Sequence, residues 1–158
     1  RVYPREILER EIQKYVDGPV KEKRALGELD HPESSVINLQ NVSHNVTKVK
    51  MVGDDVYGEV EILSTPAGNI LKELFRNGIT VGISSRGMGS VQENRDGSVE
   101  VQDDFELLCW DFVSTPSNPD SFMHLIKEGL DFTSQSKYSK VNSILQEILC
   151  SNGQCPII

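Results

Sequence analysis

Three side chains suited to acyl-transfer chemistry, a serine, a histidine and a carboxylate, occur in separate parts of this sequence. The serine lies in GISSRGMGS, residues 82–90, at the end of a short apolar run. A serine hydroxyl is a weak nucleophile until a base removes its proton. Histidine is the usual base, because the imidazole titrates near neutral pH. The sequence therefore predicts a catalytic pair if a histidine can reach this stretch.

The glycines of residues 82–90 do not complete a known phosphate-binding or hydrolase motif. A P-loop requires Lys where Met88 stands, a dinucleotide fingerprint requires Gly where Gln92 stands, and a nucleophile elbow requires Gly where Arg86 stands. One remaining interpretation is a plain hairpin turn, for which Ser-Ser-Arg-Gly is suitable. The other is a strand that presents Ser84 beside an amide-rich turn, where the amides and Arg86 could stabilise an oxyanion.

The three histidines differ in their surroundings. His44 precedes an alternating segment in a polar turn and is expected to be exposed, whereas His124 is expected on a helix as a surface or packing residue. His31 stands in the irregular segment GELDHP, where the following proline restricts the backbone and could fix the direction of the ring. The histidines are not spaced as zinc ligands. No metal and no cofactor are therefore predicted.

The elements that must position these residues form a mixed pattern. Apolar residues at helical spacing predict helices over residues 4–16, 65–78, 119–129 and 141–150. Apolar and polar residues alternate in a hairpin over 46–63 and in a second hairpin over 88–102, and an apolar strand is predicted over 105–113. Strands in the middle with helices around them favour an α+β fold with an antiparallel sheet or small barrel.

The composition sets limits on the class of protein. The chain has 158 residues, a net charge of −8 and a pI near 4.9, which disfavours non-specific nucleic-acid binding. A membrane-spanning helix needs an apolar run of about 18 residues or more, and no apolar run in this sequence is that long. The three cysteines, Cys109, Cys150 and Cys155, form no CxxC motif, so reducing surroundings are expected. The first residue is Arg1 rather than Met, and a truncated or processed product is expected.

Four segments occur in an order that resembles a known family: RVYPREILEREI, KRALGELDHP, GISSRGMGS and WDFVSTPSNPD. Over roughly residues 1–122 the chain is similar to the prohead core proteases of T-even-type tailed bacteriophages, distant relatives of the herpesvirus assemblin proteases. The resemblance implies a small, mainly antiparallel β-barrel surrounded by helices. It also implies a serine endopeptidase that digests the scaffold and trims capsid proteins inside the prohead, in the host cytoplasm.

The resemblance assigns two catalytic roles to individual residues. The histidine of GELDHP, His31, corresponds to the general base, and the first serine of GISSRG, Ser84, corresponds to the nucleophile. Ser85 is the rival, but a strand places the two serines on opposite faces, so only one can meet His31. Arg86, together with the amides of Arg86 and Gly87, corresponds to the oxyanion site.

The third member of the triad is open. Herpesvirus enzymes use a second histidine, and this sequence has none between Ser84 and Phe122. Asp111 lies inside an apolar run, where a lone carboxylate is costly unless it is paired. Orienting His31 would supply that partner. Asp111 is therefore preferred, with Glu106 and Asp104 as alternatives.

The domain organisation departs from the family in two respects. Residues 1–130 are predicted as the protease domain, in which an upstream strand of the family is missing, and residues 131–158 as a linker, an amphipathic helix and a flexible tail. The family cuts after Glu with an apolar residue two positions earlier, and Leu145-Gln146-Glu147 matches, so self-trimming is predicted there. The expected partners are scaffold and capsid proteins and further copies of the chain, with neither nucleic acid nor membrane. The alternative is an inactive assembly module that retains the fold.

Overall fold

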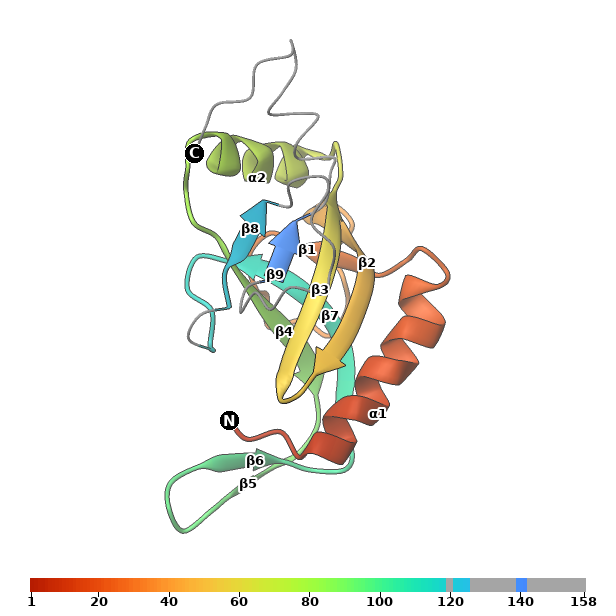
Figure 1. Ribbon diagram of the computed structural model, residues 1–158, viewed down its shortest axis with the longest axis vertical. Helices are drawn as coiled ribbons and strands as arrows, with labels where there is room; N and C mark the ends of the chain where they lie inside the picture. Colours follow the sequence, from red (N-terminus) through yellow and green to blue (C-terminus); the bar gives the residue numbers. More distant parts are fainter. Residues whose placement is uncertain (119–120, 126–138, 142–158) are drawn as a thin grey trace.

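The computed structural model describes residues 1–118, 121–125 and 139–141 (Figure 1). Within these residues a π-helical turn, Val16–Val20, follows the first helix. The helices and strands are α1 (Arg5–Tyr15), β1 (Leu26–Glu28), β2 (Val42–Val52), β3 (Asp55–Ile62), α2 (Pro66–Arg76), β4 (Gly82–Met88), β5 (Val91–Glu93), β6 (Val99–Val101), β7 (Glu106–Val113), β8 (Met123–Leu125) and β9 (Ser139–Val141).

Both helices begin where the sequence predicts. The hydroxyl of Thr65 accepts a hydrogen bond of 3.0 Å from the Gly68 amide at the N-terminus of α2, which is the usual capping contact. Gly78, just beyond the end of α2, has φ +70°, as a helix-terminating glycine should. The predicted stop of the first helix at residues 17–19 is wrong in detail, because the backbone continues through the π-helical turn.

The strands form small, mainly antiparallel sheets, as predicted. β1, β2 and β3 make one antiparallel sheet, β4 pairs antiparallel with β7, and β5 pairs antiparallel with β6. The short β8 and β9 pair in parallel. These pairings confirm the α+β class and both predicted hairpins. The predicted barrel is not found as such, because among the described residues the strands do not join into a closed barrel.

The junction between β1 and β7 brings the histidine segment over the long strand. An isolated bridge joins Leu29 to Phe112, and the Asp30 amide donates to the Phe112 carbonyl at 2.8 Å. Gly27 makes this approach possible, since a Cβ at this position would clash with the Trp110 carbonyl and the His44 ring. β1 thus lies between β2 and β7 and delivers residues 29–31 to the face of β7.

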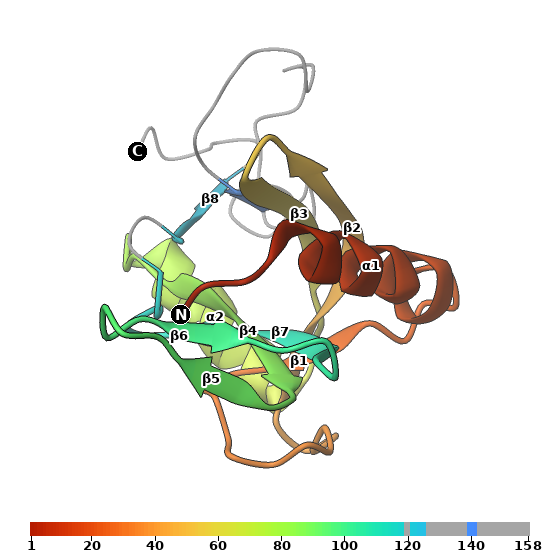
Figure 2. The same cartoon turned by 90° about the horizontal axis from the view of Figure 1, so that it is seen from below.

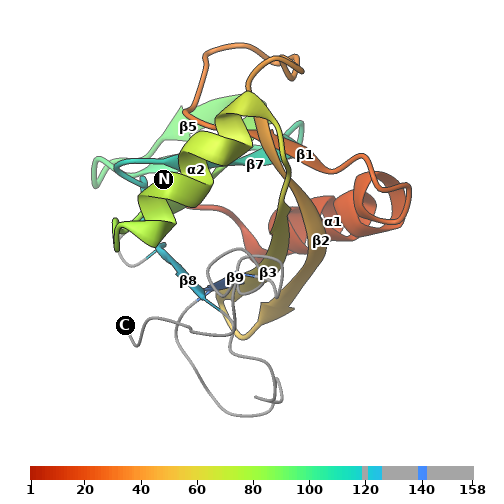
Figure 3. The ribbon, with the colours of Figure 1, turned by 90° about the horizontal axis from the view of Figure 1, so that it is seen from above.

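Apolar side chains from both main sheets and from α2 form the core. α2 covers one end of the strands (Figure 3), and the β5–β6 hairpin projects at the opposite end, near the N-terminus (Figure 2). Burial of this apolar surface is the main stabilising contribution. The buried cluster consists of Tyr15, Ala25, Val46, Val60, Ile62, Leu71, Phe75, Val81, Phe112 and Met123.

Three sequence predictions for local structure are wrong. The Ser-Ser-Arg-Gly stretch is not a turn, because β4 continues through it to Met88. The predicted helix over 119–129 is contradicted where the chain is described: Phe122 makes an antiparallel bridge to Gly82, and Met123–Leu125 form β8. Residues 139–141 form β9, where a linker and a helix start were predicted. The remainder of both predicted helices and the tail lies outside the described residues.

In the part of the chain that the structure describes, none of the helices has the length and apolar character needed to cross a bilayer.

Candidate active site

The register between β4 and β7 determines which serine shares a face with the carboxylate. Ser84 lies opposite Asp111, and Ser85 lies opposite Trp110. Directly paired residues of antiparallel strands point to the same face, and neighbours along a strand point to opposite faces. Ser84 and Asp111 therefore share one face, with Ser85 on the other. Ser84 is half-buried.

His31 reaches the same carboxylate from the segment after β1. Its Nδ1 atom lies 3.0 Å from Asp111 Oδ2. Asp30 has φ +75°, a left-handed conformation that aspartate tolerates better than most residues, and its carboxylate accepts the His31 amide at 2.9 Å. This turn directs the ring of His31 back over β7. An imidazole held at Nδ1 by a carboxylate has Nε2 free to act as a base.

Asp111 is fully buried and held from several directions. The Glu28 amide donates to its Oδ1 at 3.0 Å, and the Cys109 thiol lies 3.4 Å from the same oxygen. The Arg86 guanidinium contacts both oxygens, with Nη2 3.2 Å from Oδ1 and Nε 2.9 Å from Oδ2. A buried carboxylate requires such partners to remain charged. Its position and orientation towards His31 are thus strongly restrained.

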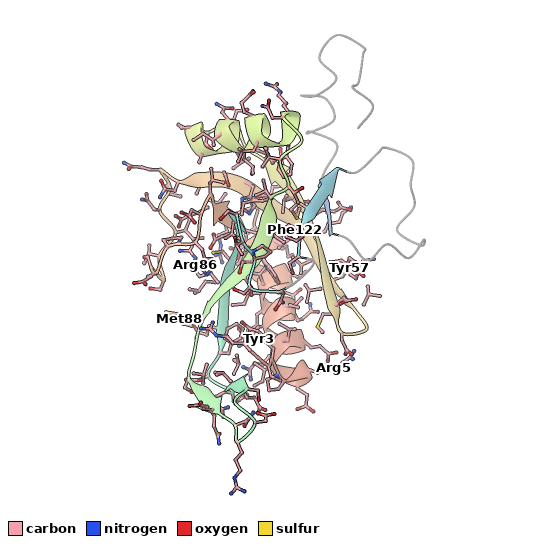
Figure 4. The ribbon with its side chains drawn as sticks, turned by 90° about the vertical axis from the view of Figure 1, so that its left-hand side faces the viewer. Tyr3, Arg5, Tyr57, Arg86, Met88 and Phe122 are labelled. Carbon is pink, nitrogen blue, oxygen red and sulfur yellow. The ribbon has the colours of Figure 1, made fainter. Side chains whose placement is uncertain are left out.

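The Arg86 side chain is buried, and the sequence did not indicate this. Nη2 lies 3.0 Å from Glu28 Oε1, and Nη1 donates to the Ser34 carbonyl at 2.8 Å. Figure 4 shows Arg86 beside the segment that follows β1. Burial alone would lower the pKa of Arg86, but the hydrogen bond to Glu28 and the neighbouring negative charges raise it, so the guanidinium remains protonated. Each of its three nitrogens already has a partner in or beside this cluster, so the structure favours the backbone amides over this side chain for the predicted oxyanion role.

The other predicted residues lie elsewhere on the same strands. Gly87 follows a β-bulge between Arg86 and Gly87, and a Cβ there would clash with the Phe105 ring. Asp104 accepts hydrogen bonds of 2.9 Å and 2.8 Å from the amide and hydroxyl of Ser90. Glu106 is exposed at the opposite end of β7 from Asp111, about 17 Å away along a strand. Of the three candidate acids, Asp111 is the one that contacts His31.

Cys109 lies within the cluster as a neutral thiol. Burial, followed by the charge of Asp111, raises its pKa to about 12. A thiol with such a pKa is not a nucleophile at neutral pH. Cys109 therefore serves as a donor to Asp111 and as packing. Across residues 1–118, 121–125 and 139–141, no group of three or more histidine, cysteine or carboxylate residues has a metal-binding arrangement.

His44, predicted to be exposed, is fully buried on β2. Its Nε2 lies 2.9 Å from the Trp110 carbonyl, its Nδ1 lies 2.9 Å from Ser43 Oγ, and its ring packs edge-on against Phe112. The Asp30 amide donates a hydrogen bond to the Phe112 carbonyl. In a regular parallel ladder, the next such hydrogen bond would join the Glu28 amide to the Trp110 carbonyl. The Glu28 amide instead binds the Asp111 carboxylate, and His44 occupies the Trp110 carbonyl.

The burial of His44 predicts an acid-sensitive stability. Burial lowers the pKa of His44 from 6.5 to about 4, although the hydrogen bond to Trp110 acts in the opposite direction. The unfolded chain therefore takes up this proton first, so the stabilisation is complete above pH 6.5 and is lost as the pH falls towards 4. We expect His44 to account for a loss of about 2 kcal/mol in unfolding free energy between pH 7 and pH 5. Urea unfolding of the parent chain and of His44→Gln measures it. Equal losses in both chains would contradict the assignment.

The comparisons with known proteins point in one direction. A family model described as prohead core protein serine protease matches residues 1–130. The prohead core protein protease of Enterobacteria phage T4 is 33% identical over 126 residues, which is 78% of this chain and 59% of that protein. The solved structure of the bacteriophage T4 capsid assembly protease matches with a TM-score of 0.69 at 32% identity, covering 72% of this chain and 70% of that chain. The chain thus spans less than two thirds of the T4 protein's length.

Proposed function

Because the chain belongs to the prohead core protein serine protease family, whose model matches residues 1–130, we propose that it is a serine endopeptidase of phage capsid maturation. The observation that carries the proposal is the 3.0 Å contact of His31 Nδ1 with Asp111 Oδ2, on the strand face that Ser84 shares. A nucleophile, a base and a buried acid are then available in one place.

The proposed mechanism follows from these positions. Ser84 Oγ attacks the substrate carbonyl carbon while His31 Nε2 takes its proton, and Asp111 stabilises the imidazolium that forms. The imidazolium then returns the proton to the leaving amine as the peptide bond breaks. Water, deprotonated by His31, attacks the acyl-enzyme ester and releases Ser84. The backbone amides of Arg86 and Gly87 are proposed as oxyanion donors, without the Arg86 side chain.

The hydroxyl of Ser84 makes no hydrogen bond to the described residues, His31 included. Catalytic hydrogen bonds are often long or absent before substrate binds and tighten in the complex. We propose that the hydrogen bond between the Ser84 hydroxyl and His31 forms when an extended peptide occupies the site.

The proposed setting follows from the family and from the T4 relatives. The substrates are internal scaffold and capsid proteins, cleaved inside the prohead in the host cytoplasm by a chain that associates with copies of itself. The fold is proposed to be a relative of the herpesvirus protease barrel. Two isolated β-bridges between separate strand pairs support this. The bridge between Leu29 and Phe112 links β1 to β7, and the bridge between Gly82 and Phe122 links β4 to the segment that enters β8.

Peptide cleavage tests the activity and its specificity together. We expect a scaffold-type peptide with an apolar residue two positions before Glu to be cut after Glu, and its Gln analogue to be cut at least about 100-fold more slowly, because a site that binds a carboxylate rejects a neutral isostere. The kcat/KM values, with products identified by mass spectrometry, measure this. Equal rates would contradict the Glu preference. Absence of any cleavage would favour the inactive assembly module.

The predicted self-trimming site after Glu147 lies outside the described residues. The mass of the chain after incubation tests whether it is cut there.

A further inference from the structure

The cluster around Asp111 contains a second buried carboxylate that the proposed mechanism does not use. Glu28 and Asp111 are fully buried, and Arg86 is 5% exposed. Glu28 and Asp111 each contact Nη2 of Arg86, at 3.0 Å and 3.2 Å. His31, with a side chain 38% exposed, lies at the rim of this cluster and contacts Asp111 alone.

The charges in the cluster balance when the base is protonated. With both carboxylates ionised and the guanidinium protonated, the buried cluster carries one net negative charge. The imidazolium of His31 neutralises it. Without Glu28, the charge of Arg86 would cancel that of Asp111, and the imidazolium would face a neutral pair. An unscreened charge in a buried site affects a neighbour far more than it would in water.

Glu28 also holds the segment that follows His31. Its Oε1 accepts the Asn38 amide at 2.9 Å, while Arg86 Nη1 binds the Ser34 carbonyl and the Leu29 amide donates to the Asn41 carbonyl. The main-chain amide of Glu28 restrains Asp111 independently of its side chain. A test must therefore separate the charge of Glu28 from its role as a hydrogen-bond acceptor.

We propose that Glu28 is a positioning residue of the protease, which offsets the charge of Arg86 so that Asp111 can stabilise the protonated His31. This inference rests on the proposed function of the same site. Arg86 aligns both oxygens of Asp111, and Glu28 restores the negative charge that this alignment would otherwise remove. Neither side chain touches the substrate in the proposed mechanism.

The groups that face the cluster come from five segments. They are Glu28 on β1, Asp30 beside His31, Arg86 on β4, Cys109 and Asp111 on β7, and Tyr15 on α1. Burial, followed by the proximity of Cys109 and Asp111, raises the pKa of Tyr15 well above its usual range. Cys109 and Tyr15 therefore stay neutral, and within the described residues Glu28 is the remaining buried carboxylate that contacts Arg86.

The substitution Glu28→Gln removes the charge and keeps an acceptor in place. We expect kcat to fall about tenfold with KM unchanged, and the acid limb of the kcat/KM profile to move about one pH unit lower, because the imidazolium loses a neighbouring negative charge. Glu28→Asp, which keeps the charge, should retain the parent profile even if its stability falls. Glu93→Gln, exposed on β5, is the matched control and should match the parent in every measurement.

A second measurement remains informative if the chain proves inactive. The His31 imidazole signal followed by NMR in the full chain should titrate at a lower pH in Glu28→Gln than in the parent and in Glu28→Asp. If this shift is seen but no peptide is cleaved, the proposed effect of the Glu28 charge on His31 is supported, and the proposed protease function is not. A fall in kcat with an unmoved pH profile and an unmoved NMR titration would overturn the proposal and leave Glu28 a purely structural residue. If Glu28→Gln does not fold, a profile for Glu28→Asp displaced from the parent would likewise overturn it.

Discussion

Replacing Ser84 by alanine is expected to lower kcat for scaffold-peptide cleavage by about 10⁴-fold or more. The β4–β7 register puts Ser84, and not Ser85, on the face that carries Asp111 and His31. Alanine removes the attacking oxygen and leaves the strand pairing intact, since a half-buried serine on β4 tolerates the loss of its hydroxyl. Steady-state cleavage measured by chromatography, with active-site titration of the parent chain, determines the effect.

Ser85→Ala is the matched control for this result. The change is chemically identical, one residue further along the same strand and on its other face. It should retain kcat within a few-fold, and both variants should melt within about 1 °C to 2 °C of the parent. Loss of activity in Ser85→Ala with normal activity in Ser84→Ala would reverse the assignment. Loss in both, with a lowered melting temperature, would point to damage to β4.

The elements with strong periodicity could be predicted from the sequence. The apolar stripe of α1, the Thr65 and Gly78 boundaries of α2 and the alternation of the two hairpins are local signals, and the structure agrees with them. The alternation of Val42, His44 and Val46 is a further local signal. It places His44 on the inward face of β2 with two buried valines. Local polarity around His44 suggested a turn instead.

The burial of Arg86 could not be predicted from its neighbours. Arginine is rarely buried unless it is paired, and the partner carboxylate of Glu28 lies 58 residues away in the sequence. The same long-range pairing keeps the polar Ser-Ser-Arg-Gly stretch in a strand. Asp111 was easier to predict, because a single carboxylate within an apolar strand has to meet a charged partner. The contact between His31 and Asp111 is of the kind expected from that reasoning.

The substitution Asp111→Asn should also reduce kcat by about 10⁴-fold, because an amide no longer fixes the His31 tautomer or stabilises the imidazolium. It carries a cost in stability as well. Arg86 would keep Glu28 as its one buried carboxylate partner, and breaking a buried ion pair costs about 3 to 5 kcal/mol. Kinetics must therefore be measured at a temperature where urea unfolding shows the variant to be folded.

The rival acids supply the controls that make the Asp111 result decisive. Asp104→Asn and Glu106→Gln make the same kind of change at residues that do not contact His31, and both should retain kcat within a few-fold. Asp104→Asn should lose only its exposed hydrogen bonds to Ser90 and should keep a stability close to that of the parent chain. If Asp111→Asn folds and cleaves at the parent rate while Glu106→Gln is inactive, the acid of the triad is at the other end of β7. The His31–Asp111 contact would then be structural, because a catalytic carboxylate cannot lose its charge without a change in the rate of proton transfer.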